Sequence, residues 1–182
     1  MKIDDHIEKQ ILTDYFLIEG TVEIDEKYFI NKIKKGFEKE NNMSFKTNVR
    51  DYMTPFEYFN NDEKFLNILK DFISYIDARI QLNKYTLIDS WGYCVRTGNK
   101  TKFHHHGRNM WSGVIYLNEH PQVLEFPDIK KQIKPKKGKF ALFSSFLKHG
   151  AQRHQSKKTK WGISFNLKWK DNKWVLKKIN IK

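Results

Sequence analysis

The chain has 182 residues, 39% of them hydrophobic and 15% aromatic, a size and composition that suit one domain with a sizeable core. No apolar run approaches the roughly 20 residues needed to span a bilayer, the first residues lack the apolar stretch of a signal peptide, and the single Cys94 excludes an internal disulfide. We therefore expect one domain over residues 1–182, soluble and located in the cytoplasm, with no membrane partner.

The net charge of +13 is unevenly distributed. Residues 129–182 contain 17 Lys or Arg and one acidic residue, whereas residues 1–128 contain 17 basic and 20 acidic residues. Such a basic third attracts nucleic acid or another polyanion in some proteins, and in others it is only a solvated lysine-rich face. No arginine-rich, zinc-finger or RNA-recognition motif supports nucleic acid as the partner here, so both interpretations stay open.

Residues 1–83 are expected to form a mainly helical layer. Within it, residues 15–24 are typical of an opening strand, and residues 25–41 carry apolar side chains at helical spacing with acids at the start. The clearest helix is predicted over residues 61–80, with Asp62 at the N-cap position and an apolar stripe along one face.

From residue 84 onward helical spacing gives way to short β-type runs separated by turn signals. Eight or nine short strands in about 100 residues indicate a sandwich or barrel. The predicted fold class is therefore α+β, with the helical layer packed on an antiparallel β-fold over residues 84–182. The predicted runs are 85–96, 101–106, 110–117, 122–126, 130–134, 139–145, 148–154, 160–169 and 173–181.

Three consecutive histidines, His104, His105 and His106, precede one of these runs. Neutral imidazole is the commonest metal ligand in proteins, and side chains at i and i+2 of a strand share a face. His104 and His106 are thus predicted to point together and His105 away. A paired His-x-His at a barrel rim would hold divalent iron, copper, nickel or zinc, although a histidine triplet alone is more often a surface feature.

A third histidine, His149, follows the apolar run at 139–145, and Lys160 lies eleven residues beyond it. The double-stranded β-helix is the jelly-roll fold that cupins also have. It can hold one metal and one dianionic cosubstrate through a His-x-His pair, a distal histidine and then a cation. The cation neutralises the far carboxylate while the near end chelates the metal. This order predicts a double-stranded β-helix core.

Four segments in order resemble the iron(II)- and 2-oxoglutarate-dependent oxygenases, and most closely the short oxygenases of marine phages and bacteria. The resemblance implies a hydroxylase that uses Fe(II), 2-oxoglutarate and O2, working in the host cytoplasm if it is phage-encoded. The segments are FKTNVRDYMTPFEYF at 45–59, FHHHGRNMWSGVIYLN at 103–118, GKFALFSSFLKHG at 138–150 and KWGISFNLKW at 160–169.

Carried over residue by residue, the resemblance implies metal ligation by His104, His106 and His149, with no further catalytic side chain. Lys160 falls where the family has an arginine for the 2-oxoglutarate carboxylate. Ser164, four residues on, would donate a hydrogen bond to that carboxylate.

The chain departs from the family pattern at two places. His106 stands where a carboxylate ligand is usual, which leaves the metal site one unit more positive and attracts the dianion more strongly. Glu125 or Asp128 would complete the usual ligand set if either reached the metal. Lysine in place of arginine at Lys160 keeps the charge and loses the planar, two-pronged grip.

Several further residues are candidates for pocket walls. Tyr93 precedes the histidines on a predicted strand and is assigned to the cosubstrate. The substrate itself would be a protein side chain such as a prolyl residue, a nucleic acid base or a small molecule. The weaker candidates for contact with it are Arg96, Arg108, Trp111 and Tyr116, with Trp91 beside them, although aromatic residues in a β-core mostly serve packing.

Two other functions stay open at this point. One is a cupin-like dioxygenase that binds metal through three histidines without 2-oxoglutarate, although Met110 and Trp111 occupy the region of the usual cupin glutamate. The other is a non-enzymatic binding module whose basic surface holds an acidic partner. Only the oxygenase hypothesis predicts a metal-dependent chelate of 2-oxoglutarate.

Overall fold

The computed structural model describes residues 2–6, 16–39, 47–80, 85–107 and 111–169. Ten strands, two α-helices and a short 3-10 helix make up this part of the chain. The last predicted run, 173–181, lies outside the described residues. No described helix has the length and hydropathy to cross a bilayer.

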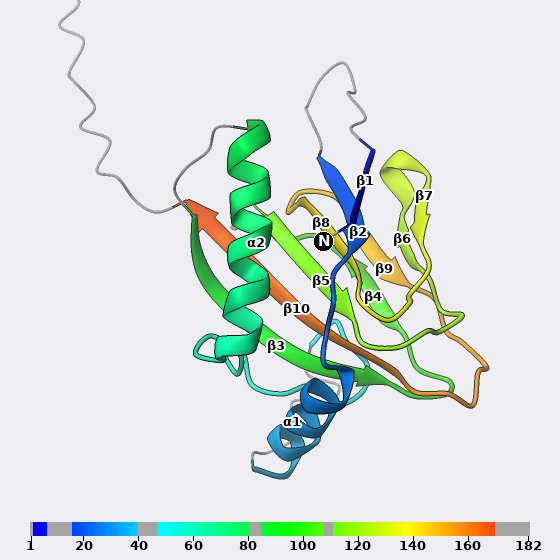
Figure 1. Ribbon diagram of the computed structural model, residues 1–182. Helices are drawn as coiled ribbons and strands as arrows, with labels where there is room; N and C mark the ends of the chain where they lie inside the picture. Colours follow the sequence, from blue (N-terminus) through cyan, green and yellow to red (C-terminus); the bar gives the residue numbers. More distant parts are fainter. Residues whose placement is uncertain (1, 7–15, 40–46, 81–84, 108–110, 170–182) are drawn as a thin grey trace, which may run out of the picture.

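The strands form two antiparallel sheets that face each other (Figure 1). The large sheet has the order β1-β2-β8-β5-β10-β3, and the small sheet has the order β4-β9-β6-β7. The large sheet comprises β1 (Lys2–His6), β2 (Leu17–Thr21), β8 (Lys139–Ser144), β5 (Trp111–Tyr116), β10 (Lys160–Trp169) and β3 (Tyr85–Val95). The small sheet comprises β4 (Thr101–His104), β9 (His149–Ala151), β6 (Leu124–Phe126) and β7 (Lys131–Ile133), with the 3-10 helix at Pro127–Ile129 between β6 and β7.

This arrangement is a double-stranded β-helix in an α+β protein, as the sequence predicts. All eight strands from β3 to β10 fall within the predicted runs. The strand β1 was not predicted, and with β2 it extends the large sheet. The described part of residues 1–83 thus contributes two strands to the large sheet besides the two α-helices, and β2 matches the opening strand expected at residues 15–24.

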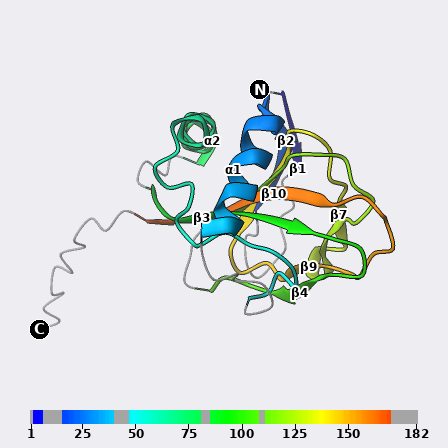
Figure 2. The ribbon, with the colours of Figure 1, turned by 90° about the horizontal axis from the view of Figure 1, so that it is seen from below.

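Two helices cover the outer face of the large sheet. Figure 2 shows α1 (Glu26–Lys39) and α2 (Glu63–Ile80) on one side of β10 and β3, with β4 and β9 on the other. A helix packs on a sheet only if it buries an apolar stripe, and both helices do so. The core beneath them includes Phe29, Ile33, Phe65, Phe72, Ile115, Phe140, Ile163 and Phe165.

The start of α2 explains why the helix begins where it does. The backbone N–H of Phe65 donates to Oδ1 of Asp62 at 2.8 Å, which is the N-cap contact that the sequence predicts. The other carboxylate oxygen of Asp62 accepts from the hydroxyl of Tyr28 and from Nζ of Lys32. One buried side chain thus caps α2 and ties it to α1.

A second core lies between the two sheets. Because successive side chains of a strand point to opposite faces, the alternate residues of the same strands turn inward. Those of the large sheet include Trp91, Tyr93, Val114, Tyr116 and Phe143, and those of the small sheet include Leu124, Phe126 and Ile133. Both faces of the large sheet are therefore buried. The outer face packs on the helices, and the inner face borders the space between the two sheets.

Candidate metal centre and pocket

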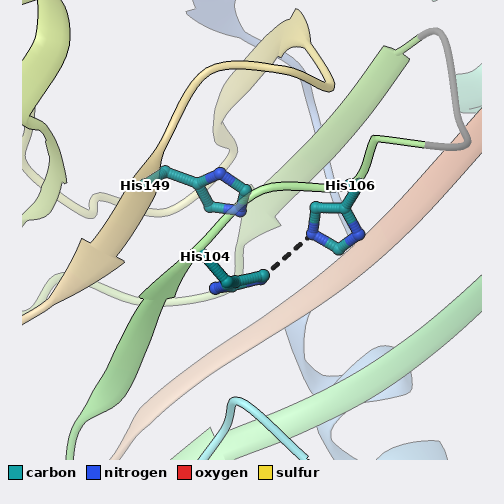
Figure 3. A group of neighbouring side chains, drawn as sticks. All are labelled: His104, His106 and His149. Atoms are coloured by element: carbon teal, nitrogen blue, oxygen red, sulfur yellow. Dashed lines mark hydrogen bonds between the residues drawn. The ribbon is translucent and has the colours of Figure 1, made fainter.

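Three histidines, two from neighbouring strands and one from the loop after β4, meet at one end of the space between the sheets (Figure 3). His104 ends β4, His149 begins β9, and these two residues are direct partners in the antiparallel pairing. One ring nitrogen of each of His104, His106 and His149 lies within 4.8 Å of those of the other two. The structure therefore brings together all three histidines that the sequence singles out, while His105 is exposed and outside the group.

His106 reaches this point by a route that strand alternation did not foresee. It lies two residues beyond the end of β4, so it is not a strand residue. Its backbone N–H donates to the carbonyl of Ser145 at 2.7 Å, which anchors the loop to the segment between β8 and β9. Its Nε2 then lies 3.0 Å from Nε2 of His104.

Backbone carbonyls fix the tautomers of two of the rings. Nδ1 of His104 lies 2.7 Å from the carbonyl oxygen of Lys102, and Nδ1 of His149 lies 2.9 Å from that of Leu147. A carbonyl oxygen only accepts, so each Nδ1 carries the proton and each Nε2 keeps its lone pair. This is the arrangement of the outer hydrogen bonds that orients metal-binding imidazoles.

Burial keeps the three rings neutral. It lowers the pKa of His104, although the hydrogen bond to the Lys102 carbonyl partly opposes it. Burial and the neighbouring histidines lower the pKa of His106 to about 4 and that of His149 to about 3. Metal ions bind the neutral form of imidazole, so near neutral pH no proton has to leave these rings first.

A cavity of about 330 Å³ extends from the histidines along the inner face of the large sheet. Lys160, at the start of β10, lies at its other end and is only 2% exposed. Burial alone lowers the pKa of Lys160 to about 7. Among the described residues no carboxylate pairs with its ammonium group, so a buried cation faces the cavity without a counter-charge.

Two phenols and a hydroxyl line the cavity between Lys160 and Asn166. Tyr93 and Ser164 line it, as expected for residues assigned to the cosubstrate, and so does Tyr116. Burial raises the pKa of Tyr93, and burial together with the neighbouring Tyr93 raises that of Tyr116. Tyr116, which the sequence had assigned to the substrate, thus lines the same cavity as the two residues proposed for the cosubstrate.

Gly162 allows Tyr93 to occupy this position. The two residues are cross-strand partners of β10 and β3. A Cβ atom on Gly162 would come within 2.6 Å of the Tyr93 hydroxyl oxygen and 2.7 Å of the ring carbon that bears it. Only a residue without a side chain leaves room for the ring, so this glycine lets Tyr93 reach the cavity wall.

Three sequence candidates do not contribute to the cavity as expected. Arg96 is committed elsewhere: its guanidinium pairs with the fully buried Asp51 at 2.8 Å and lies over the ring of Tyr52. Trp111 points to the opposite face of the sheet and packs in the core under the helices. Arg108 lies outside the described residues.

Neither proposed replacement carboxylate joins the histidines. Glu125 is a middle residue of β6 whose neighbours Leu124 and Phe126 turn into the core, so its own side chain points away. A carboxylate oxygen of Asp128 accepts from the backbone N–H of Lys148 at 3.4 Å. Within the described part of the chain, the group that fits a metal consists of histidines alone.

The structure adds lining residues that the sequence analysis missed. These are Phe56 and Asp89, which line the cavity together with Trp91, a residue that the sequence had named as a candidate for the pocket wall. Asp89 and Trp91 alternate along β3 with residues that face the helices, so the sequence predicts that these two side chains share one face of the strand. The sequence does not predict which of the two faces points to the cavity, because both faces of this strand are buried.

No family model matches the sequence, and no curated protein matches it either. Several solved structures share its fold. A viral collagen prolyl hydroxylase from Paramecium Bursaria Chlorella virus-1, in complex with 2-oxoglutarate, matches 84% of this chain and 94% of its own with TM-score 0.65 and 19% identity. A prolyl-4-hydroxylase from Pseudomonas putida matches 85% and 93% with TM-score 0.66 and 12% identity. HygX from Streptomyces hygroscopicus, with nickel and 2-oxoglutarate bound, matches 85% and 82% with TM-score 0.57 and 11% identity.

Proposed function

We propose that this chain is an iron(II)- and 2-oxoglutarate-dependent oxygenase that hydroxylates a C–H bond of an organic substrate. The observation that carries the proposal is a single cavity with three neutral histidines at one end and the unpaired, buried Lys160 at the other. The shared fold with 2-oxoglutarate-binding proteins and the sequence resemblance to short phage and bacterial oxygenases support it.

The residues present fit a divalent iron. His104, His106 and His149 would be its ligands, and three imidazoles on one side leave open positions for a chelating cosubstrate and O2. When bound, iron and 2-oxoglutarate supply oxidative decarboxylation to succinate and carbon dioxide coupled to hydroxylation of the substrate. With no carboxylate among the ligands, the site is one charge more positive than the two-histidine, one-carboxylate arrangement.

Lys160, Tyr93 and Ser164 would hold the far carboxylate of 2-oxoglutarate. An unpaired ammonium costs several kcal/mol when it is removed from water, and an incoming carboxylate offsets that cost. The hydroxyls of Tyr93 and Ser164 line the same cavity and supply hydrogen-bond donors. The aromatic walls exclude water and so strengthen these interactions.

The buried Lys160 also separates this function from the alternatives. A three-histidine dioxygenase without 2-oxoglutarate would use a cation at the far end of the cavity only if its own substrate carried an anionic group there. A binding module that uses its basic surface would carry its lysines in solvent. The binding module does not account for an ammonium group that is 2% exposed and faces the space between the sheets, whereas 2-oxoglutarate supplies the matching carboxylate.

Anaerobic titration with iron(II) and then 2-oxoglutarate tests the proposal. The wild-type protein should bind one iron, and 2-oxoglutarate should then produce the visible charge-transfer absorption of an iron chelate. His106→Ala should weaken iron binding about tenfold or more, because a three-point ligand set becomes two-point. His105→Ala, the adjacent exposed histidine, is the matched control and should behave like wild type.

Three results would contradict parts of the proposal. Unchanged iron affinity in His106→Ala would remove His106 from the ligand set. Iron binding without any spectral response to 2-oxoglutarate would favour the cupin-like dioxygenase, and absence of iron binding would favour the non-enzymatic module.

A further inference from the structure

The cavity carries opposite charges at its two ends. Of the described residues that line it, Lys160 is the only lysine and Asp89 the only carboxylate. On β10, Lys160 is the partner of Val95, and Asn166 is the partner of Asp89. Six residues of a strand span about 20 Å, so Asp89 is too far from Lys160 to neutralise it.

A chain of hydrogen bonds places Asp89 near the histidine end. Nδ2 of Asn166 donates to Oδ1 of Asp89 at 2.7 Å, and the hydroxyl of Ser112 donates to Oδ1 of Asn166 at 2.7 Å. The hydroxyl of Ser112 also lies 3.4 Å from that of Ser145, whose carbonyl anchors His106. The chain leads from β3 across β10 and β5 to the loop that positions the metal group (Figure 1).

The carboxylate of Asp89 lacks a counter-charge. Burial raises its pKa, the hydrogen bond from Asn166 partly opposes that, and the negative charge of the nearby Glu57 raises it further. The chain contains 34 Lys and Arg, yet none of those in the described ranges pairs with Asp89. Its second oxygen has no donor among the described residues.

Aromatic rings line the same cavity as this carboxylate. Phe56 lines the same cavity, is 46% exposed, and packs edge-on against Trp91 with ring centroids 5.2 Å apart. The next residue, Glu57, has a φ of 72°, an uncommon conformation for a residue other than glycine. An exposed ring and an unpaired carboxylate in one cavity are the combination that recognises an organic cation, through charge pairing and cation–π attraction.

We infer that Asp89 and Phe56 recognise a positively charged nitrogen, a primary ammonium or a guanidinium, on the primary substrate. The inference deepens the proposed function and rests on it, because it places the substrate at the histidine end of the cavity, opposite Lys160. The substrate cation supplies the counter-charge that Asp89 lacks, and its alkyl chain lies along Phe56 and Trp91. Asp89 is thus a specificity-determining residue.

Binding of matched cationic and neutral probes to the nickel- and 2-oxoglutarate-loaded protein tests this inference by ligand-observed NMR. The small probes are butylammonium, butylguanidinium and neutral butyramide. The peptide probes are Gly-Lys-Gly, Gly-Arg-Gly and neutral Gly-Pro-Gly, all acetylated and amidated. Tighter binding of the cationic peptides assigns the cation to a protein side chain, and tighter binding of the amines assigns it to a small molecule.

Asp89→Asn keeps an acceptor for Asn166 and removes the charge. It should weaken the cationic probes about tenfold or more, the loss of roughly one charge pair, and leave the neutral probes within about twofold. Glu38→Gln, an exposed carboxylate on α1, is the control and should match wild type. Phe56→Ala, at an exposed position, should also weaken the cationic probes selectively, and it serves as the second variant if Asp89→Asn does not fold.

Equal binding of cationic and neutral probes by wild type would overturn the inference, as would full retention of cation binding in both variants. Repeating the measurement without metal and 2-oxoglutarate separates the two proposals. Selective cation binding through Asp89 in a protein that fails to chelate 2-oxoglutarate would keep the cation site and reject the oxygenase. A 2-oxoglutarate chelate without cation selectivity would keep the oxygenase and reject the cation site.

Discussion

At the scale of single residues, the buried Lys160 destabilises the ligand-free fold, and an anionic ligand would offset this loss of stability. It is 2% exposed, and burial lowers its pKa to about 7 from an ordinary 10.5. A lysine with a lowered pKa destabilises the ligand-free fold as the pH falls from the ordinary value toward about 7, because the unfolded chain binds the proton more readily. A hydrophobic side chain at this position would give a more stable ligand-free fold.

Lys160→Met should therefore separate stability from binding. We expect the ligand-free variant to be more stable than wild type near pH 7.5 by about 1–4 kcal/mol. Its affinity for 2-oxoglutarate in the nickel-loaded protein should fall by about 2–5 kcal/mol. Urea denaturation and calorimetry measure the two quantities, with the exposed Lys157→Met as control. Equal affinity in Lys160→Met would mean that another group holds the carboxylate.

At the scale of elements, Asp62 joins the two helices that support the large sheet from outside. Burial alone would raise the pKa of Asp62, but the hydrogen bonds from Lys32, Tyr28 and the N–H of Phe65 outweigh it and lower the pKa. The contribution of this carboxylate to stability is present above its ordinary pKa and is lost as the pH falls through the folded-state value. These contacts lie on the face of the sheet away from the cavity.

Asp62→Ala should destabilise the fold without changing the site. We expect a loss of about 2–3 kcal/mol, because the variant removes an N-cap and leaves Lys32 without its carboxylate. Asp71→Ala, an exposed position on the same helix, should change stability by less than about 0.5 kcal/mol. Denaturation measures stability, and nickel-dependent binding of 2-oxoglutarate should be equal in both variants. A loss of binding in Asp62→Ala would show that α2 shapes the cavity directly.

At the scale of the whole molecule, the excess of basic groups and several buried histidines make acid the destabilising direction. Besides the three at the candidate metal centre, His120 and His154 are buried and pack edge to face, 4.5 Å between ring centroids. His120 accepts at Nδ1 from the N–H of Gln122 and donates from Nε2 to the carbonyl of Lys158. This double contact fixes the neutral ring.

His120 should make the fold sensitive to mild acid. Burial, followed by smaller charge effects, lowers its pKa to about 4 from 6.5, so the unfolded chain takes up a proton first as the pH falls below about 6.5. Stability should fall by about 2 kcal/mol between pH 7.5 and pH 5 from this residue alone. Urea denaturation of metal-free protein at both pH values should show a smaller fall in His120→Gln than in wild type. The exposed His105→Gln should keep the wild-type fall; an equal fall in His120→Gln would assign the acid sensitivity to other groups.

The sequence by itself was sufficient for what depends on local periodicity and spacing. The apolar stripe and Asp62 predicted α2, alternation predicted the strands from β3 to β10, and the order of His104, His149 and Lys160 predicted residues that the structure places along one cavity. These features follow from short stretches of chain, in which backbone geometry alone decides which side chains share a face.

Tertiary structure alone decided which of two buried faces is the inside. A strand between helices and a second sheet is apolar on both faces. Its sequence pattern therefore shows which residues share a face, but not which face points to the cavity. For that reason Trp111 was placed in the pocket, Asp89 was overlooked, and Arg96 was read as a pocket residue when a distant Asp51 pairs with it. His106 likewise depends on the Ser145 carbonyl, 39 residues away, since no local rule extends beyond the end of β4.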